Sequence, residues 1–514
     1  MAPAALVSEE ADIQNKQKQK QNEGPTEAFD LEDASLNIEN IEALYAAGSV
    51  TPVDVVRSIY RRIASSTDQA VWITLVPEEE ALRSAEELVR RYQGEDAKPA
   101  LYGIPFSVKD SIDIAGLPTT LACPSYAYTA VETAPVVQRI LAEGGILIGK
   151  TNLDQFATGL NGTRSPYGSP RCVYDADYVS GGSSSGSVVS VAAGMVSFTV
   201  ATDTAGSTRV PSAFNGVVGL KPTLGTISTV GLVPACKTAD CITIIAKSSY
   251  TARRALQVMR AYDADDAYAR DDLQLAVLAA QSSWWDARQG GRVRFAIPPW
   301  HVVNDALCQT YRQLFTDVVK TLSDLPFMSA DHAVDYTPFA SANAMLYGSS
   351  IVSQRIVAFK TYLDSHGMDK LHPVIRDIFS ASTGFDAVRA YEDIFSLAKY
   401  KRDAARQFRS HQTSPVQKGF DVLVVPSTAT HPTVDEMLSD PINLNKRLGS
   451  FTHFVNLLDL CAVAVPVGGT WKSVNGKQMP FSITLISTPG HDEDLLELAE
   501  RLMNVDWTTR SRVD

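Results

Sequence analysis

The chain has 514 residues but few cysteines and no long apolar run. The cysteines show no C-x-x-C pair, so we expect free buried thiols in a reducing compartment and not a disulfide framework. They are Cys123, Cys172, Cys236, Cys241, Cys308 and Cys461. No run of about 18 apolar residues is present, and the N-terminus lacks a basic stretch followed by an apolar one. We therefore expect a cytoplasmic protein that does not enter a membrane.

Positive charge is also in short supply. The 46 Lys and Arg residues face 58 Asp and Glu residues, for a net charge of -12 at pH 7. Bulk electrostatics therefore argue against a nucleic acid partner. The eight histidines show neither H-x-H nor H-E-x-x-H spacing. We expect no metal site and no cofactor.

The remaining composition indicates a large α/β domain. Residues 1–33 include the polar tract Asn15 to Asn22 and lack periodicity, so we expect a disordered tail. Beyond it, helical periodicity alternates with apolar strand candidates. We expect helices over 52–63, 80–92 and 134–143 and strands over 102–108 and 146–148. Because no linker or composition shift follows, residues 34–514 should form a single domain, without an additional C-terminal domain.

One glycine-rich segment matches a nucleotide-binding pattern. Gly144 to Thr151 (GGILIGKT) satisfies G-x-x-x-x-G-K-[ST], which would make Lys150 a phosphate ligand. A phosphate loop needs a flexible backbone with inward-pointing amides, whereas Ile146, Leu147 and Ile148 favour a buried strand. We interpret the segment as a strand.

A second segment matches the nucleophile elbow of α/β-hydrolases. Gly182 to Gly186 (GSSSG) satisfies G-x-S-x-G, which would make Ser184 a nucleophile. An elbow follows a buried strand, but the preceding Asp175 to Ser180 is too polar for one. A flexible linker is the plain alternative. Because the apolar stretch Val188 to Met195 follows at once, we interpret the run as the N-terminus of a buried helix.

A third serine lies in the loop Thr202 to Arg209 (TDTAGSTR), after the apolar stretch Phe198 to Ala201. Small residues before a serine let backbone amides converge on one point, as an oxyanion hole requires. Alone, such a loop is more often a tight turn. Its significance comes from its combination with Lys109, which ends a buried strand, and with Ser183, which stands 24 residues before Ser207.

These three pieces together resemble the amidase-signature family, whose pattern joins a lysine, a G-G-S-S-x-G run and a T-D-T-x-G-S loop. The resemblance implies an α/β fold with a mixed central β-sheet covered by helices on both faces. It implies Ser207 as the nucleophile, Ser183 as a bridging serine after a cis peptide, and Lys109 as the base. The oxyanion hole would consist of the amides of Thr204, Ala205, Gly206 and Ser207.

Within the family, the closer likeness is to the amidase domain of allophanate hydrolases. It rests on DIAGLPTT, ACPSYAY, GKTNLDQFATGL, GTRSPYGSPRC, TDTAGS, GLVPACKTADC, VPSTATHPT and FVNLLDL. Tyr347 and Arg355 fall where this subgroup has a substrate-binding tyrosine and arginine. An arginine fork matches a carboxylate, and a tyrosine hydroxyl can satisfy a further oxygen. The resemblance thus implies hydrolysis of allophanate in urea breakdown, with release of ammonia.

The implied mechanism sets a requirement on Lys109. A lysine has a pKa of about 10.4, which must fall by roughly 3 units before the amine is neutral near pH 7. Burial lowers the pKa of a lysine, because water no longer solvates the charged form. We therefore expect Lys109 to be dry.

Four positions depart from the subgroup pattern, namely Asn161, Ala201, Thr208 and Gly216. Thr208 adjoins the nucleophile, and we expect its bulk to narrow or reshape the acyl pocket. An amidase or carbamate hydrolase for another small amide is therefore an alternative. An amidase-like subunit that serves a complex is a second one, against which Lys109, Ser183 and Ser207 together argue. The partners expected are a small-molecule amide substrate and, as the assembly, a homodimer.

Overall fold

The computed structural model describes residue 31 and residues 34–279, 283–285, 292–331, 334–408 and 419–507. The tail expected over residues 1–33 lies outside these residues except for Leu31. None of the helices in the described ranges is both long and apolar enough to cross a membrane.

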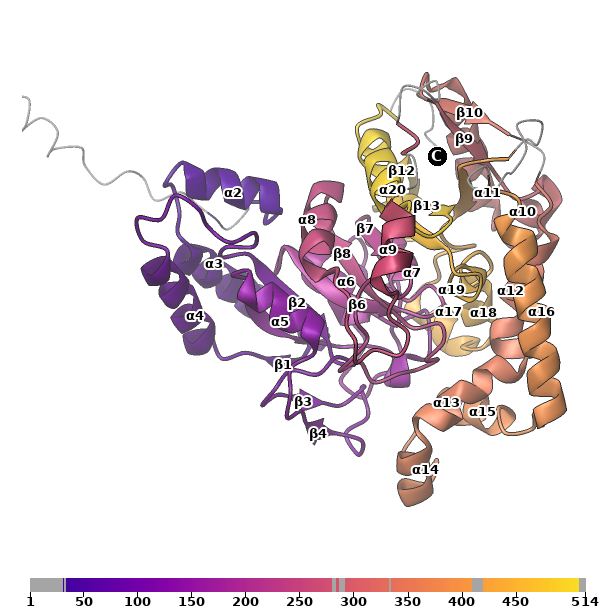
Figure 1. Ribbon diagram of the computed structural model, residues 1–514, viewed down its shortest axis with the longest axis horizontal. Helices are drawn as coiled ribbons and strands as arrows, with labels where there is room; N and C mark the ends of the chain where they lie inside the picture. The colour runs from indigo at the N-terminus through magenta and orange to yellow at the C-terminus, as the bar shows by residue number, and fades with distance from the viewer. Residues whose placement is uncertain are drawn as a thin grey trace, which may run out of the picture.

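A mixed β-sheet runs through the molecule (Figure 1) and confirms the predicted fold class. In the described part of the chain it has eleven strands. In spatial order they are β1 (Trp72–Leu75), β5 (Ile146–Thr151), β2 (Pro105–Lys109), β6 (Phe198–Asp203), β8 (Cys241–Ala246), β7 (Val218–Lys221), β12 (Cys461–Lys472), β13 (Gln478–Ser487), β11 (Val422–Pro426), β9 (Val293–Ala296) and β10 (Met328–Ala330). Neighbours are parallel in β5-β2-β6 and in β11-β9-β10, and antiparallel elsewhere.

The predicted helices of the N-terminal half begin and end close to their expected positions. Thr51 and Asp54 form a capping box at the start of α3 (Pro52–Ser65), each side chain accepting the other's backbone N–H. The other helices in this half are α2 (Ile38–Ala46), α4 (Glu78–Arg91), α5 (Pro135–Ala142), α6 (Ser185–Ala192), α7 (Arg209–Phe214) and α8 (Ser249–Met259), with the short turns η1 (Gln69–Val71) and η2 (Gln155–Ala157). The strands β3 (Pro118–Thr119) and β4 (Tyr128–Thr129) form a separate small sheet.

The C-terminal half contributes mostly helices (Figure 1). They are α9 (Asp272–Ala279), α10 (Trp300–Ala306), α11 (Gln309–Asp324), α12 (Thr337–Gly348), η4 (Ser350–Ser353), α13 (Gln354–Ala358), α14 (Lys360–His366), α15 (Pro373–Ala381), α16 (Ala387–Ala405), α17 (Val434–Ser439), α18 (Asn443–Leu448), α19 (His453–Leu457) and α20 (Asp492–Met503). In Figure 1, α12 to α16 lie together on the side of the molecule opposite α3 and α4.

Helices cover both faces of the sheet. The hydroxyl of Ser107 in β2 lies 3.0 Å from that of Ser190 in α6. The neighbouring Phe106 side chain instead reaches Gly145, just after α5, where an added Cβ would lie 3.2 Å from its ring. Because successive strand residues point to opposite faces, α5 and α6 lie on opposite sides of β2. Lys109 is two residues after Ser107 and therefore points to the α6 side.

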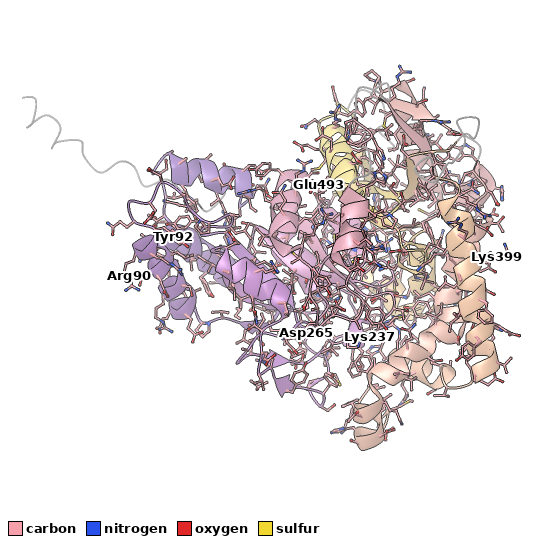
Figure 2. All side chains as sticks on the ribbon, viewed as in Figure 1. Arg90, Tyr92, Lys237, Asp265, Lys399 and Glu493 are labelled. Carbon is pink, nitrogen blue, oxygen red and sulfur yellow. The ribbon has the colours of Figure 1, made fainter. Side chains whose placement is uncertain are left out.

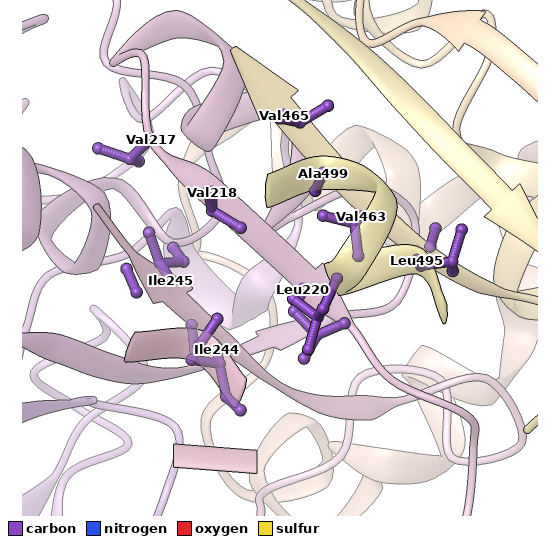
Figure 3. Packing of buried hydrophobic residues seen from close by; sticks show 14 of the residues in the cluster. Val217, Val218, Leu220, Ile244, Ile245, Val463, Val465, Leu495 and Ala499 are labelled. Carbon is purple, nitrogen blue, oxygen red and sulfur yellow. The ribbon is translucent and has the colours of Figure 1, made fainter. Parts of the chain in front are cut away.

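The centre of the sheet is a continuous apolar core (Figure 3). Leu220 of β7, Ile244 of β8 and Val463 of β12 are fully buried, and Leu495 and Ala499 of α20 lie beside Val463. Burying one such side chain contributes about 1.5–3 kcal/mol relative to leaving it exposed. The strands therefore form a rigid base for the loops that leave their ends.

Candidate active site

Three parallel strands bring polar residues to one edge of the sheet. Lys109 ends β2, Asp203 ends β6, and Asp154 follows β5 by three residues. All three side chains are fully buried. The charged side chains labelled in Figure 2, such as Arg90 and Lys399, lie instead on the outside of the molecule. Buried charges are costly unless they are paired or hydrogen-bonded, so this edge is a candidate functional site.

Lys109 is held by two hydroxyl groups. Its Nζ donates to Ser183 Oγ and to Thr202 Oγ1, each at 2.8 Å. Burial lowers the pKa of Lys109 to about 7, although Asp154, Asp203 and Asp240 act to raise it. The lysine is as dry as the sequence led us to expect. Thr202, its second partner, was not foreseen.

The glycine- and serine-rich run is the N-terminal approach to α6, as interpreted from the sequence. The Gly182–Ser183 peptide bond is cis, and the Ser183 carbonyl accepts the Asp154 N–H at 3.0 Å. Ser184 Oγ donates to the Thr202 carbonyl at 3.2 Å, and the Ser184 N–H donates to the Ser207 carbonyl at 3.3 Å. These bonds bring the Ser207 loop against the Ser183 segment. They engage Ser184 structurally, which disfavours the elbow interpretation.

The loop that carries Ser207 is organised by Asp203. The Asp203 carboxylate accepts the N–H of Gly206 at 2.7 Å and that of Thr208 at 3.2 Å. Arg209 forks onto the same carboxylate at 2.8 and 2.9 Å. Burial alone would raise the pKa of Asp203, but Arg209 and the Gly206 N–H hold it below its usual value. The ionised carboxylate therefore fixes the turn.

Gly206 differs from its expected role. Its N–H donates to the Asp203 carboxylate. The expected oxyanion hole of four amides requires this N–H to be available to the substrate oxygen. Its φ of +121° lies in the region that favours glycine, and an added Cβ would lie 2.6 Å from Thr452 Oγ1. The structure gives Gly206 a part in shaping the loop.

Residues from the C-terminal half complete this loop. Thr452 Oγ1 donates to the Ala205 carbonyl at 2.6 Å, and Asn456 Nδ2 donates to the Asp203 carbonyl at 2.6 Å. Arg209 returns bonds to the Thr452 carbonyl at 3.1 Å and to Asn456 Oδ1 at 3.0 Å. Sequence reasoning did not assign these residues. The available signal was a single polar residue, Asn456, inside the apolar stretch FVNLL.

Tyr347 and Arg355 lie together, as predicted. The Arg355 Cζ is 5.9 Å from the centre of the Tyr347 ring. Tyr347 packs against the cluster that contains Ala205 of the serine loop, and Arg355 is among the charges that lower the pKa of Lys109. Arg355 is only 2% exposed. Over the described ranges, no carboxylate forms an ion pair with it within 4.0 Å.

Thr208 corrects one expectation from the sequence. Its hydroxyl contacts Thr243 Oγ1 of β8 and donates to the Thr202 carbonyl at 3.4 Å. The side chain is therefore turned into the sheet, where β8 supplies a hydroxyl partner, and does not reshape an acyl pocket. Asn161 bonds Asn445 at 2.8 Å, so this departure serves packing between segments. Ala201 lies inside β6, and Gly216 has a φ of +60°.

Lys150 has a structural role. It lies in β5, with its Nζ 3.1 Å from Asp110 Oδ1 and 2.7 Å from Thr119 Oγ1. Both members of this ion pair are fully buried, which supports the interpretation of the Walker-like segment as a strand. The described residues contain no group of three or more His, Cys, Asp or Glu side chains placed to hold a metal ion. All six cysteines are unpaired.

Comparison with known proteins identifies the class. The family model named Amidase matches residues 54–496, and the chain belongs to this family of enzymes that hydrolyse C–N bonds. It is 38% identical over 475 residues to the urea amidolyase of Saccharomyces cerevisiae, covering 91% of this chain. It is 35% identical over 465 residues to the urea amidolyase of Lachancea kluyveri, covering 88% of this chain. The chain spans 23% of the length of each of these two relatives.

Among solved structures, the allophanate hydrolase of Kluyveromyces lactis is similar at a TM-score of 0.79 and 34% identity. The match covers 94% of this chain and 74% of that one. The chain is an amidase-signature hydrolase similar to allophanate hydrolase.

Proposed function

We propose that this chain hydrolyses the terminal amide of allophanate and releases ammonia as a step in urea degradation. The observation that carries the proposal is the buried Arg355, which forms no ion pair with any carboxylate of the described residues. An unpaired buried charge costs several kcal/mol, on the order of what a bound carboxylate would recover. The urea amidolyase and allophanate hydrolase relatives point to the same substrate.

Arg355 and Tyr347 would select and orient the substrate. Allophanate carries a carboxylate at one end and an amide at the other. The guanidinium fork offers paired donors to the carboxylate, and the Tyr347 hydroxyl can satisfy a further oxygen. A fixed clamp at one end presents the amide carbonyl to Ser207 at the other.

In the first half of the reaction, Ser207 Oγ attacks the amide carbonyl and forms the new C–O bond. Its proton passes to Ser183, whose own proton passes to the neutral Lys109 that it contacts at 2.8 Å. The N–H groups of Thr204, Ala205 and Ser207 hold the oxyanion, while Gly206 keeps the loop in shape. Ser183 then protonates the leaving nitrogen and takes its own proton back from Lys109, so ammonia departs from the acyl-enzyme and Lys109 is neutral again.

In the second half, water attacks the acyl-enzyme. Lys109 again accepts the proton through Ser183, and Ser207 Oγ leaves with a proton returned along the same path. The product is the dicarboxylic N-carboxycarbamate, which yields ammonia and carbon dioxide on decarboxylation. No step in this scheme uses a cofactor.

The test is ammonia release from allophanate, from its neutral analogue biuret, and from simple amides and carbamates. Arg355→Ala should lower kcat/KM for allophanate by roughly 2–5 kcal/mol in transition-state free energy, the range for truncating one partner of a buried charge pair. Biuret should lose far less. Arg389→Ala, which removes a half-exposed arginine of α16, is the matched control. A wild type that prefers neutral amides, with Arg355→Ala unchanged, would rule out allophanate and leave a general amidase.

We also propose that the chain forms a homodimer. Val388, Tyr391, Ile394 and Phe395 are exposed on α16 at spacings that share one helix face. A contiguous exposed apolar patch often marks a surface that contacts another protein. Light scattering should give twice the chain mass, and Phe395→Glu should halve it. A monomeric wild type would contradict the proposal.

Two further expectations belong with this function. We propose a cytoplasmic enzyme, because its six thiols are unpaired, as is usual in reducing compartments. We also propose one domain from Ala34, supported by the single sheet that joins both halves of the chain. Cell fractionation tests the first, and the second predicts one protease-resistant fragment that begins near Ala34.

A further inference from the structure

The segment 154–164 links Ser183 to the arginine clamp. Asp154 donates its N–H to the Ser183 carbonyl, and its carboxylate accepts the N–H groups of Gly162 at 3.1 Å and Arg164 at 3.0 Å. An added Cβ on Gly182 would lie 2.1 Å from Asp154 Oδ2. The segment is therefore closed into a loop that presses directly against the Gly182–Ser183 peptide.

Thr158 lies in the middle of this loop and is fully buried. Its hydroxyl donates to the Phe156 carbonyl at 3.0 Å and accepts Arg355 Nη1 at 2.7 Å. A hydroxyl has one proton, so the bond to Phe156 turns its lone pairs toward Arg355. Arg355 Nη1 is thereby anchored, and the remaining guanidinium donors keep one orientation.

Aromatic packing holds the segments that carry Thr158 and Arg355 in place. Phe156 and Ala157 have φ of +53° and +51°, a conformation that is unfavourable for residues with a Cβ. Phe156 is fully buried against Phe359, with ring centres 4.2 Å apart. The Phe359 N–H donates to the Arg355 carbonyl at 3.1 Å, so the same contact fixes the helix that carries Arg355.

A second buried arginine fixes the backbone of Thr158. Arg164 is 2% exposed, and its two terminal nitrogens donate to the Thr158 carbonyl at 2.9 Å and to the Pro441 carbonyl at 2.7 Å. Thr158 therefore receives one arginine on its carbonyl and another on its hydroxyl. The loop has little freedom to move its hydroxyl away from Arg355.

From these contacts we infer that Thr158 is a positioning residue that orients Arg355 toward the carboxylate of the substrate. The inference rests on the proposed function. Thr158 does not touch the reacting atoms, and it sets the preference for amides that carry a carboxylate over neutral ones. Because its loop is also bonded to Ser183, it fixes the carboxylate-binding end of the site relative to the amide-cleaving end.

The experiment compares Thr158→Val with Thr158→Ser on allophanate and on biuret. Valine keeps the shape but removes the acceptor, whereas serine keeps the hydroxyl. Thr158→Val should raise KM for allophanate about 10-fold or more, the effect of losing one charge-assisted hydrogen bond. Its kcat for allophanate and its kinetics on biuret should stay within about twofold, and Thr158→Ser should behave as wild type.

The same substitution in an Arg355→Ala background provides the decisive control. If Thr158 acts through Arg355, adding Thr158→Val to Arg355→Ala should change KM no further, because the two effects share one interaction. An unchanged KM in Thr158→Val, an additive effect in the double variant, or equal losses on both substrates would overturn the inference. The proposed function is tested separately by whether the wild type hydrolyses allophanate, a measurement that needs no Thr158 variant.

Discussion

Burial changes the chemistry of Lys109 more than its charged neighbours do. Three carboxylates act to raise its pKa, yet loss of water lowers it to about 7. The two hydroxyl partners, Ser183 and Thr202, satisfy the amine whether it is charged or neutral. A lysine on a protein surface stays charged at neutral pH, whereas the buried Lys109 can exchange a proton there.

The first prediction is a pH profile. Lys109 must be neutral to accept a proton, and it is protonated below its pKa. The value of kcat/KM should therefore rise as pH increases, with an acidic limb centred at about 7. Initial rates of ammonia release from pH 5.5 to 9 measure it. A profile that is flat through pH 7, or that falls with increasing pH, would contradict the role of Lys109 as the base.

The second prediction separates the two adjacent serine loops. Ser207→Ala should reduce kcat by about 10⁴-fold or more, because it removes the attacking oxygen. Ser184→Ala should cost only about 1 kcal/mol of stability, since its hydroxyl bonds a carbonyl of β6. Turnover and thermal unfolding of both variants provide the comparison. An inactive Ser184→Ala beside an active Ser207→Ala would restore the elbow interpretation.

At the scale of elements, the serine loop between β6 and α7 depends on the residues around α19. Thr452 holds the Ala205 carbonyl, and Asn456 holds the Asp203 carbonyl. An oxyanion hole works only when its amides are fixed before the charge develops. The loop therefore needs residues from both halves of the chain for its geometry.

The third prediction concerns Thr452. Thr452→Val keeps the packing against Gly206 but loses the bond to Ala205, so kcat should fall about 10- to 100-fold, less than the loss of an oxyanion donor itself. KM should change little, because the clamp at Arg355 is intact. Thr452→Ser retains the hydroxyl and serves as the control. Equal losses in the valine and serine variants would show that packing, and not the hydrogen bond, governs the loop.

Local signals predicted the elements that a short stretch of sequence specifies by itself. The capping box at Thr51 and the apolar runs at β2 and β5 depend on neighbouring residues, and they lie where expected. Thr452 and Thr158 were missed, because their partners are 247 and 197 residues away in the sequence. The expectation for Thr208 considered only its place beside Ser207, whereas Thr243 of the neighbouring strand β8 decides where its side chain points.

For the whole molecule, a buried lysine with a lowered pKa costs stability. Between about pH 7 and its unfolded pKa of about 10.5, the unfolded chain binds more protons at this site than the folded one does. The free energy of unfolding therefore rises with pH in this window, and the cost is complete below about pH 7.

The fourth prediction uses Lys109→Met, which removes the titrating group and keeps its length. The free energy of unfolding of the wild type, relative to that of the variant, should increase by about 2–3 kcal/mol from pH 6 to pH 9. The hydroxyl contacts that the variant loses do not titrate, so their loss changes the free energy of unfolding by the same amount at pH 6 and at pH 9. Thermal unfolding of the two proteins at each pH measures the difference. A difference that does not change with pH would mean that Lys109 has its ordinary pKa.

The bonds from Thr452 and Asn456 to the serine loop also bear on how the protein matures. They span 247 and 253 residues, and contacts between such distant segments form late because closing long loops costs entropy. A nascent chain that has left the ribosome only as far as α8 already carries Lys109, Ser183 and Ser207, but not the residues that hold their loop. During refolding, turnover should therefore return after the circular dichroism of the helices. We therefore expect amide hydrolysis only from the completely folded chain and not from partly synthesised or partly folded forms.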